Sequence, residues 1–448
     1  MDAANSALLT DLYQLNMTQA YLEHRLTDTA VFEFFMRALP ASRNFLIAAG
    51  LEPALAFLEG LRFSADDLAW LESTGRFSRQ LVEYLKDFRF TGAVHAMPEG
   101  TAFFADEPIL RVTAPLPQAQ LLETRLINLL HFHTLIASKA ARMVLAAPGK
   151  LMVDFGLRRA HGAEAGVMAA RASYLAGFAG TATVLAGKLD GLPLFGTMAH
   201  SFIEAYDDEA AAFESFARSR PDNLVVLLDT YDTAAAARKV VALAPRLRAA
   251  GIAIRGVRLD SGDLAALSQE VRRILDDGGL AEVTIFASGG LDENEIARLL
   301  AMGAPIDGFG VGTSLTTSSD LPALDCAYKL QEYAGLARRK HSSAKATWPG
   351  RKQVWRRYGP DGRMAGDTLS LEDDAQPGSP LIEPVMRDGR RLSPPAPLAD
   401  ARARVARELK RLPERLRGLA RGEPYPVVVA DAVKRLAAEV DRRLAKWA

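Results

Sequence analysis

The sequence predicts an α/β protein whose middle part is a parallel β/α barrel, and three observations support this fold class. Short apolar runs recur between residues 224 and 315, and a polar or glycine-rich turn follows each of them. Stretches rich in Ala, Leu and Arg separate the runs and have the pattern of helices. Before residue 125 the pattern changes to mixed helices and alternating strands, which indicates a separate α+β part. Strand, turn and helix in repeated order are typical of βα units around one parallel sheet.

The clearest strands of the expected barrel end in turns that suit an anion. Apolar runs cover residues 224–229, 254–260, 283–287 and, more briefly, 307–313. The last two turns contain Ser288, Gly289, Gly290, Gly310, Gly312 and Thr313. Glycine leaves backbone N–H groups uncovered beside a helix start, and barrel enzymes bind phosphate after their last two strands. We therefore predict a phosphate-ester site at the C-terminal mouth of a closed barrel.

The N-terminal part is expected to combine helices with an antiparallel sheet. Residues 7–23 have the pattern of an amphipathic helix, in which the pattern alone favours a half-buried core position for Tyr13. The elements expected after it are a strand at 30–37, helices at 45–61 and 64–90, a small sheet at 92–112 and a long helix at 117–146. His131 and His133 in the long helix stand two residues apart and point to different faces, so a shared metal ion is not expected.

Earlier strand ends carry further candidate residues. Residues 151–155 form an expected strand that runs into Arg158 and Arg159. A guanidinium fork suits a carboxylate or a phosphate, and a surface salt bridge is the alternative. Residues 194–200 repeat the pattern of apolar run, glycine and helix start, as residues 177–184 do. His200 would then lie at the barrel mouth, and the pattern alone leaves open whether its role is functional or structural.

Three carboxylates, Asp229, Asp260 and Asp263, also stand at strand ends. Carboxylates there can bind ribose hydroxyls, or hold Mg²⁺ that also keeps waters and phosphate oxygens. Helix capping is the alternative, and it explains Asp263 well and Asp260 less well.

Beyond residue 315 the barrel pattern decays. Residues 327–343 are expected to run from a helix into a basic loop, with strands at 354–358 and 368–371 and an irregular connection at 374–397. Residues 401–422 carry eight Lys/Arg against two Glu in a basic amphipathic pattern. Such a helix can bind RNA or a membrane, but a solvated face is the ordinary explanation because the run lacks aromatic stacking groups.

Whole-chain composition excludes several classes of partner. Lys+Arg and Asp+Glu both number 54 in 448 residues, so no net charge draws the protein to nucleic acid or to an acidic membrane. One cysteine, Cys326, excludes an internal disulfide and fits a reducing compartment. The sequence shows no apolar N-terminal leader and no uncharged run long enough for a bilayer, and we therefore expect a cytoplasmic protein.

An ordered set of motifs over residues 8–315 resembles the nicotinate phosphoribosyltransferase family. The matching segments are 9–13 (LTDLY), 32–37 (FEFFMR), 134–142 (TLIASKAAR), 154–159 (DFGLRR), 180–181 (GT), 196–201 (GTMAHS), 258–263 (RLDSGD), 288–290 (SGG) and 308–313 (GFGVGT). The resemblance implies an irregular β/α barrel of the type II phosphoribosyltransferase kind. It also implies an α+β sandwich domain built from the N-terminal part and C-terminal segments. The domains expected are 1–125, a catalytic barrel at 126–325, and an extension at 326–448 that packs on the first domain.

The resemblance implies a reaction as well. The family joins nicotinate to 5-phosphoribosyl 1-diphosphate, which releases diphosphate and forms nicotinate mononucleotide. ATP is a co-substrate whose hydrolysis is coupled through a phosphorylated histidine, and His200 matches that histidine by position. Mg²⁺ is the expected cofactor, held mainly by the substrate diphosphate. Charge separates between the ribose C1 and the leaving group, so such a site needs cations and fixed dipoles.

Catalytic and phosphate-binding roles follow from the same resemblance. Asp260 resembles the ribose-binding carboxylate, Arg258 resembles a phosphate-contacting cation, and His200 completes the expected catalytic group. The two glycine-containing turns, 288–290 and 310–313, resemble the cradle of the 5′-phosphate.

The resemblance also predicts how nicotinate binds. Phe155 and Tyr13 resemble the two aromatic walls around the pyridine ring, and Tyr13 would come from a partner subunit, which implies a homodimer with shared active sites. Arg158 is expected on the nicotinate carboxylate or on a phosphate, and Thr181 is expected to line the pocket. Related nicotinamide-using enzymes carry an Asp where this chain has Ala182, so its absence favours the acid as substrate.

Some segments depart from the family pattern, and three different functions compete with the one that the resemblance implies. Residues 39–44 lack an expected glycine pair, His133 stands where an amide is expected, and the basic segment 401–422 is unusual for the family. A barrel aldolase or isomerase acting on a sugar phosphate would need a Schiff-base lysine or an acid/base pair at strand ends, but Lys139 and Lys188 lie on expected helices. The second competing function is that of a nicotinamide-specific relative, and the third is that of an RNA-binding protein that uses the basic tail.

Overall fold

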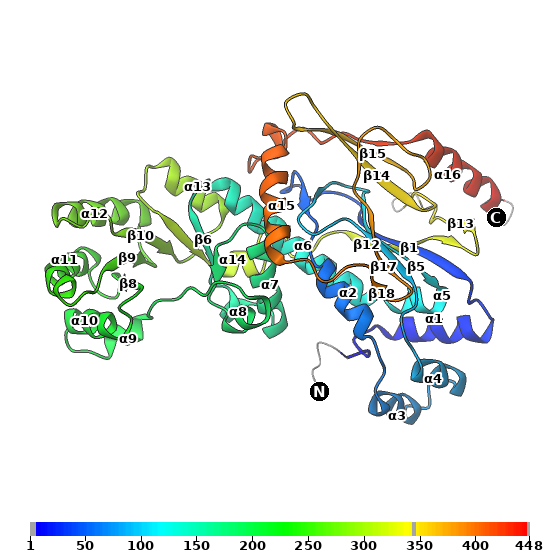
Figure 1. Ribbon diagram of the computed structural model, residues 1–448, viewed down its shortest axis with the longest axis horizontal. Coiled ribbons are helices and arrows are strands. Elements are labelled where there is room, and N and C mark those ends of the chain that lie inside the picture. The colour runs from blue at the N-terminus through cyan, green and yellow to red at the C-terminus, as the bar shows by residue number, and fades with distance from the viewer. Residues whose placement is uncertain (1–5, 343–345, 446–448) are drawn as a thin grey trace. The chain divides into compact units, whose positions relative to one another are not determined.

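The computed structural model describes residues 6–342 and 346–445 (Figure 1), which belong to two compact units. One unit joins Met1–Ser138 to Ala323–Ala448, and the other is the continuous segment Lys139–Pro322. The boundary falls inside the long helix α6 (Glu123–Ala146). Each unit contains its own β-sheets.

The continuous unit contains a six-stranded parallel sheet, which confirms the predicted βα pattern. Its strand order is β7-β6-β11-β10-β9-β8, and each neighbouring pair is parallel. The strands are β6 (Leu151–Asp154), β7 (Gly180–Thr181), β8 (Leu224–Leu227), β9 (Ile254–Leu259), β10 (Thr284–Ser288) and β11 (Gly308–Val311). Its helices are η2 (Leu157–Arg159), α7 (Ala163–Leu175), α8 (Val184–Asp190), α9 (His200–Glu204), α10 (Glu209–Ser219), α11 (Thr233–Ala249), α12 (Leu264–Asp277), α13 (Glu293–Ala301) and α14 (Thr313–Thr316).

This sheet is open, so the prediction of a closed barrel is wrong. β7 and β8 are its edge strands, and the parallel bridge between Thr181 and Leu194 is the one further step beyond β7 among the described residues. With only two residues, β7 is too short to carry the ladder onward. The result is a half-barrel whose strands all run in one direction, so their C-terminal ends still share one rim.

Aspartate caps fix the start of the helices that follow three neighbouring strands. The side chains of Asp232, Asp263 and Asp292 accept hydrogen bonds from first-turn N–H groups of α11, α12 and α13. Such caps satisfy donors that have no partner within the helix itself. The capping alternative is therefore the correct one for Asp263.

The other unit has a seven-stranded sheet that mixes strands from both ends of the chain. Its order is β13-β12-β1-β5-β3-β17-β18, and β1 lies antiparallel between β5 and β12. The strands are β1 (Thr29–Met36), β3 (Ala93–Ala96), β5 (Pro108–Pro115), β12 (Cys326–Tyr333), β13 (Leu336–Ala337), β17 (Glu383–Arg387) and β18 (Arg390–Arg391).

Strand β12 overturns the helix expected at the start of residues 327–343, of which Ser343 lies outside the described residues. Tyr328 of β12 is buried and stacks on Phe32 of β1, with ring centroids 4.8 Å apart. Burial against a strand far away in sequence, and not local propensity, decides the conformation here.

Several N-terminal predictions need smaller corrections. The helix expected at 45–61 begins instead with β2 (Leu46–Ile47), and Gly50 at φ +95° turns the chain into α2 (Leu51–Gly60). The stretch 64–90 forms two helices, and 117–146 also divides. The remaining elements here are α1 (Leu12–Glu23), α3 (Ala65–Ser73), α4 (Arg79–Lys86), β4 (Ala102–Phe103) and α5 (Leu116–Leu121). His131 accepts the Leu324 N–H at 2.9 Å, and His133 Nδ1 lies 2.7 Å from the Leu129 carbonyl, so both have structural partners.

A buried ion cluster anchors α15 (Leu398–Arg411), the helix of the basic segment. Arg356 pairs with Asp367 at 2.6 Å and with Glu408 of α15 at 2.9 Å. Glu408 also accepts the Ala102 N–H at 3.1 Å. One of the two glutamates of this segment thus ties it to β14 (Lys352–Tyr358). The remaining elements of this unit are β15 (Met364–Leu371), β16 (Ser379–Pro380), β19 (Val427–Val429), η3 (Glu414–Leu416) and α16 (Asp431–Leu444).

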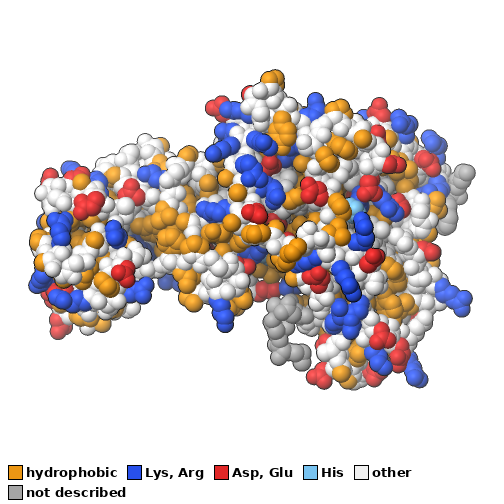
Figure 2. All heavy atoms as spheres, in the orientation of Figure 1, with side chains coloured by type: hydrophobic (Ala, Val, Ile, Leu, Met, Phe, Trp, Pro, Cys, Tyr) orange, Lys and Arg blue, Asp and Glu red, His pale blue; other side chains and the backbone are white. Residues whose placement is uncertain are grey.

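The surface carries both signs of charge. On the face shown in Figure 2, basic and acidic side chains are interspersed, in keeping with equal totals of 54 each. Within residues 6–342 and 346–445, no helix is both long enough and apolar enough to cross a membrane.

Candidate active site

Two adjoining cavities open at the rim where the parallel strands end. The larger, here called the His200 cavity, has a volume of about 500 Å³ and is lined by Phe155, Leu157, Arg158, Ala182, Gly196, Thr197, Met198, Ala199, His200, Leu227, Arg258 and Asp260. The smaller, here called the glycine cavity, has a volume of about 350 Å³ and is lined by Phe155, Arg158, Arg159, Arg258, Asp260, Ser288, Gly289, Gly290, Leu291, Gly310, Gly312, Thr313, Ser314 and Ser319. Phe155, Arg158, Arg258 and Asp260 line both. Candidate residues from separate strand ends thus come together.

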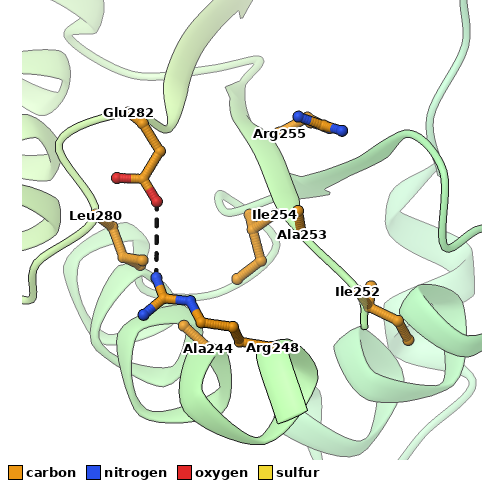
Figure 3. Close-up of a pocket in the computed structure, with 8 residues that line it drawn as sticks. All are labelled: Ala244, Arg248, Ile252, Ala253, Ile254, Arg255, Leu280 and Glu282. Atoms are coloured by element: carbon orange, nitrogen blue, oxygen red, sulfur yellow. Dashed lines mark ion pairs between the residues drawn. The ribbon is translucent and has the colours of Figure 1, made fainter. Parts of the chain in front are cut away.

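A third hollow of about 190 Å³ lies at the opposite ends of β9 and β10 (Figure 3). Its ion pair joins Arg248 to Glu282 over 3.7 Å, and the two side chains are 69% and 65% exposed. A pair so exposed contributes little. Ligands of open parallel sheets bind beyond the carboxyl ends of the strands, so this hollow is not the candidate site.

Arg258 lines both cavities and contacts several of their other lining residues. Its Nε donates to Ser288 Oγ at 2.8 Å, and its Nη2 donates to Asp260 Oδ1 at 2.6 Å. The guanidinium also lies over the Phe155 ring, 5.3 Å from its centroid. Arg258 and Asp260 stand two residues apart at the end of a strand, which directs both side chains to one face. Their contacts hold a cation and a carboxylate side by side at the junction.

Asp260 is held in its ionised form. Burial of this carboxyl disfavours the charge, but the hydrogen bond from the Ser288 hydroxyl and the Arg258 guanidinium outweigh burial, so the pKa of Asp260 is lowered. Behind it, Asp229 Oδ2 accepts the Asp260 N–H at 3.0 Å. The other Asp229 oxygen is buried with no hydrogen-bond partner among the described residues. The rim therefore carries two neighbouring carboxylates, and the side chain of Asp229 binds the backbone of Asp260.

His200 lies on the same rim as the glycine turns. Its Nδ1 is 3.1 Å from Thr230 Oγ1, and its Nε2 is 3.9 Å from Asp260 Oδ2. Asp260 in turn accepts from Ser288, at the start of the first glycine turn. The imidazole is 39% exposed and begins helix α9. A partly exposed histidine with one anchored nitrogen can meet a ligand in the cavity.

Backbone geometry explains why the turns use glycine. Gly289 adopts φ +91°, and a Cβ there would lie 1.9 Å from the carbonyl oxygen of Asp260. A Cβ on Gly310 would lie 2.6 Å from the Phe155 ring, so this glycine makes room for an aromatic wall. Gly290 at φ +64° meets no such obstacle. The Ser314 hydroxyl donates to the Leu291 carbonyl and joins the two turns directly.

Thr181 is not among the residues that line the two cavities, and its place in the nicotinate pocket stays a prediction. It is fully buried, and its hydroxyl donates to Asp154 Oδ2 at 2.6 Å. Burial raises the pKa of Asp154, against the hydrogen bonds from Thr181 and from the Gly156 N–H. The strand β7 thus turns Thr181 inward and leaves its neighbour Ala182 on the cavity side.

The predicted nicotinate-binding residue Arg158 lines both cavities. Arg158 is exposed in both cavities and forms no ion pair among the described residues, so the salt-bridge alternative finds no support there.

Tyr13 lies on α1 in the other unit and is 47% exposed. Its contribution to a partner's pocket stays a prediction.

Sequence reasoning missed several residues of the glycine cavity. Leu291, Ser314 and Ser319 line it. The serines follow the last glycine turn, and their hydroxyl-rich run, Thr313–Ser319 apart from Leu315, was the signal that could have found them. Asp154 was also overlooked as a support, although it directly precedes Phe155.

An open parallel sheet with glycine turns, a strand-end carboxylate and a histidine on one rim is typical of an enzyme that binds a phosphate-bearing ligand. Family models agree on the class. The nicotinate phosphoribosyltransferase (NAPRTase) N-terminal domain matches residues 8–131, the NAPRTase family matches 151–335 and the C-terminal domain matches 378–437. The basic segment 401–422 falls inside the last match, so it belongs to a family domain.

Whole-chain relatives give the same result. The chain is 51% identical to nicotinate phosphoribosyltransferase pncB2 of Mycobacterium tuberculosis, covering 95% of this chain and 92% of that protein. It is similar to the crystal structure of human nicotinic acid phosphoribosyltransferase, with a TM-score of 0.85 at 31% identity over 97% and 99% of the two chains. A nicotinate-nucleotide pyrophosphorylase from Pyrococcus furiosus follows with a TM-score of 0.75 at 26% identity over 92% and 96%. The chain therefore belongs to the nicotinate phosphoribosyltransferase family, an enzyme family of NAD biosynthesis, and its predicted fold class is confirmed.

Proposed function

We propose that this enzyme joins nicotinate to 5-phosphoribosyl 1-diphosphate, forming nicotinate mononucleotide and diphosphate, and couples the reaction to ATP hydrolysis through phosphorylated His200. The observation that carries the proposal is the set of four residues that line both cavities: Phe155, Arg158, Arg258 and Asp260. A ligand that fills both cavities must pass these four side chains, as a sugar with a phosphate at one end and a base at the other would.

In this proposal the ribose phosphate occupies the glycine cavity. Backbone N–H groups of the turns 288–290 and 310–313 bind the 5′-phosphate, and no Cβ blocks their approach at the glycines. Asp260 binds the ribose hydroxyls in its ionised form, which its lowered pKa supports. The carboxylate also stabilises the positive charge that develops on the sugar as diphosphate leaves, while Arg258 stabilises the departing negative charge.

Nicotinate occupies the His200 cavity. Phe155 supplies an aromatic wall, and Arg158 pairs with the carboxylate of the substrate by a bidentate fork. Ala182 at the cavity wall adds no negative charge. This arrangement favours the acid over the neutral amide, because a carboxylate beside the ring would repel nicotinate.

ATP acts through His200. The γ-phosphoryl group moves to an imidazole nitrogen, ADP leaves, and water later releases phosphate from the histidine. The Nε2 atom, 3.9 Å from Asp260, faces the same carboxylate that serves the ribose, which supports coupling between the two events.

Mg²⁺ fits this rim as an ion held mainly by substrate. The described residues contain no group of three His, Cys, Asp or Glu that could hold a metal ion. Asp229 and Asp260 do offer two carboxylates, and one Asp229 oxygen is buried and unpartnered among the described residues. Mg²⁺ often uses one or two carboxylates with waters and substrate phosphates, and it neutralises charge on a leaving diphosphate.

The active form in this proposal is a cytoplasmic homodimer with catalysis in the segment 126–325. Tyr13, Leu9 and Leu12 form an exposed apolar group on and beside α1, with 47%, 39% and 49% exposure. A second apolar group surrounds α8, where Val184, Leu185, Leu189 and Leu194 are at least half exposed, and hydrophobic side chains reach the surface there in Figure 2. Exposed apolar patches of this kind mark interaction sites, and Tyr13 would complete the partner's pocket.

The variant His200→Asn tests the ATP coupling. It should lose ATP-stimulated turnover by roughly a hundredfold or more, as removal of a catalytic nucleophile does, while slow ATP-independent transfer remains. Product formation and ADP release are measured together, with nicotinate and with nicotinamide. The exposed His161 of the same unit provides the control His161→Asn, which should behave as wild type. An His200→Asn enzyme that still hydrolyses ATP in step with product would remove the phosphohistidine from the mechanism.

A further inference from the structure

A second buried ion cluster lies within the continuous unit and includes residues that follow the two glycine turns. Lys139 Nζ donates to Asp320 Oδ1 at 2.7 Å and lies 2.6 Å from Glu293 Oε2, a close ion pair outside hydrogen-bond geometry. Arg142 Nε donates to Glu293 Oε1 at 3.0 Å. The side chains of Lys139 and Glu293 are each 1% exposed. The lysine is thus sealed from solvent with its ammonium between two carboxylates.

Each of these carboxylates follows one of the two glycine turns in the chain. Glu293 is the first residue of α13 and follows the first turn, Ser288–Gly290, after two residues. Asp320 follows Ser319, a lining residue of the cavity beyond α14. Lys139 comes from a third element, α6. The side chain of Lys139 therefore connects the segments that follow both turns to the long helix α6.

We infer that Lys139 is a positioning residue that sets the spacing of the two glycine turns and thereby the affinity of the site for a 5′-phosphate. This inference rests on the proposed function, in which these turns bind the phosphate. The four groups of the cluster carry formal charges that cancel, so Lys139 acts through the geometry of the turns and not through a net field at the ligand.

Burial of the cluster is, by itself, weak evidence for a role in stability. Desolvating an ammonium and a carboxylate costs as much as their attraction returns, and an apolar set of the same size is often equally stable. A buried pair does, however, hold its partners at one distance and in one register. The hydrogen bond from Ser314 to Leu291 links the ends of the two turns directly, and Lys139 links the segments that follow them through Glu293 and Asp320.

The test compares Lys139→Met with a matched control in the same unit. Lys239 pairs with the buried Glu209 at 2.9 Å between α11 and α10, and neither residue lines a cavity, so Lys239→Met also removes the lysine partner of a buried carboxylate. We expect Lys139→Met to raise the KM for 5-phosphoribosyl 1-diphosphate and the inhibition constant of nicotinate mononucleotide about ten- to a hundredfold, because each well-aimed donor to a charged oxygen is worth about a factor of ten. The KM for nicotinate should stay within about twofold, and Lys239→Met should leave all three constants unchanged.

Asp320→Asn provides the second variant, because its side chain is 30% exposed and the change keeps an acceptor for Lys139. It should raise the same two constants several-fold, and the double variant should show less than the combined effect, as expected of residues in one network. Equal rises for nicotinate and the sugar diphosphate, or an unchanged KM for the latter, would overturn the inference. If Lys139→Met does not fold, Asp320→Asn decides alone. A wild-type enzyme that fails to saturate with 5-phosphoribosyl 1-diphosphate would instead refute the proposed function.

Discussion

Ala182 shows how one small side chain bears on the choice of substrate. It follows the inward-facing Thr181 and lies on the wall of the His200 cavity. Arg158 in the same cavity has no carboxylate paired with it among the described residues. An acidic ligand would therefore meet, at Arg158, a cation that no carboxylate of the described residues pairs with, which is the charge pattern that nicotinate requires.

Replacing Ala182 by Asp should weaken use of nicotinate. We expect kcat/KM for nicotinate to fall about tenfold to a hundredfold, because a like charge beside the substrate carboxylate costs about one or more kcal/mol. The value for nicotinamide should fall much less. Ala182→Ser, which adds a neutral polar group, serves as the control. A nicotinate loss that is equal in the Asp and Ser variants would mean that size and not charge governs this wall.

At the scale of elements, the first glycine turn is held by contact between neighbouring strand ends. Gly289 stands against the Asp260 carbonyl, whereas Gly290, one residue further, has open space around its Cα. The two residues share a positive φ but differ in what surrounds them. Substitutions at these two positions therefore distinguish the effect of backbone strain from the effect of a steric overlap.

Gly289→Ala should be far more damaging than Gly290→Ala. The first change combines left-handed strain with an overlap at Asp260, and we expect a loss of about 3 kcal/mol or more in the free energy of unfolding. The second change adds only the strain, about 1 kcal/mol. Denaturant unfolding measures the stabilities, and the KM for 5-phosphoribosyl 1-diphosphate should rise chiefly in Gly289→Ala. Similar losses in both variants would contradict the close contact at Asp260.

The strand-and-turn pattern of the continuous unit could be predicted because its signals are local. Runs such as 254–260 combine a short apolar strand with a turn whose residues have few other uses. β12 could not be predicted, because its burial depends on β1, about 300 residues earlier in the chain. The inward direction of Thr181 was also hidden, since a two-residue strand has no alternation to show its faces. Lys139 looked like an ordinary helical lysine because the sequence does not reveal which carboxylates surround it.

At the scale of the whole molecule, the question is whether two subunits share each active site. Tyr13 belongs to one unit and the two cavities belong to the other. The proposed dimer supplies Tyr13 across subunits, and closed twofold assemblies of this kind repeat each contact twice. A defect in Tyr13 and a defect in Arg158 would then affect different sites of a mixed dimer.

Mixing two defective variants tests that arrangement. Tyr13→Ala and Arg158→Ala should each lose most activity, but unfolding and refolding them together should restore about a quarter of the wild-type value, since half of the dimers are mixed and each has one intact site. Refolding each variant alone is the control. No recovery in a mixture proven to contain mixed dimers would place Tyr13 in its own subunit's site or outside the site.

The interleaved seven-stranded sheet has a consequence for how the protein is made. A ribosome that adds about 5–20 residues per second needs roughly 15 to 60 seconds to reach β12 after it has finished β1. During that interval β1 can pair with β5, but its other edge has no native neighbour. Unpaired strand edges recruit other chains, so the nascent N-terminal half depends on shielding until its last strands leave the exit tunnel. The segment Lys139–Pro322, continuous in sequence, is free to fold meanwhile.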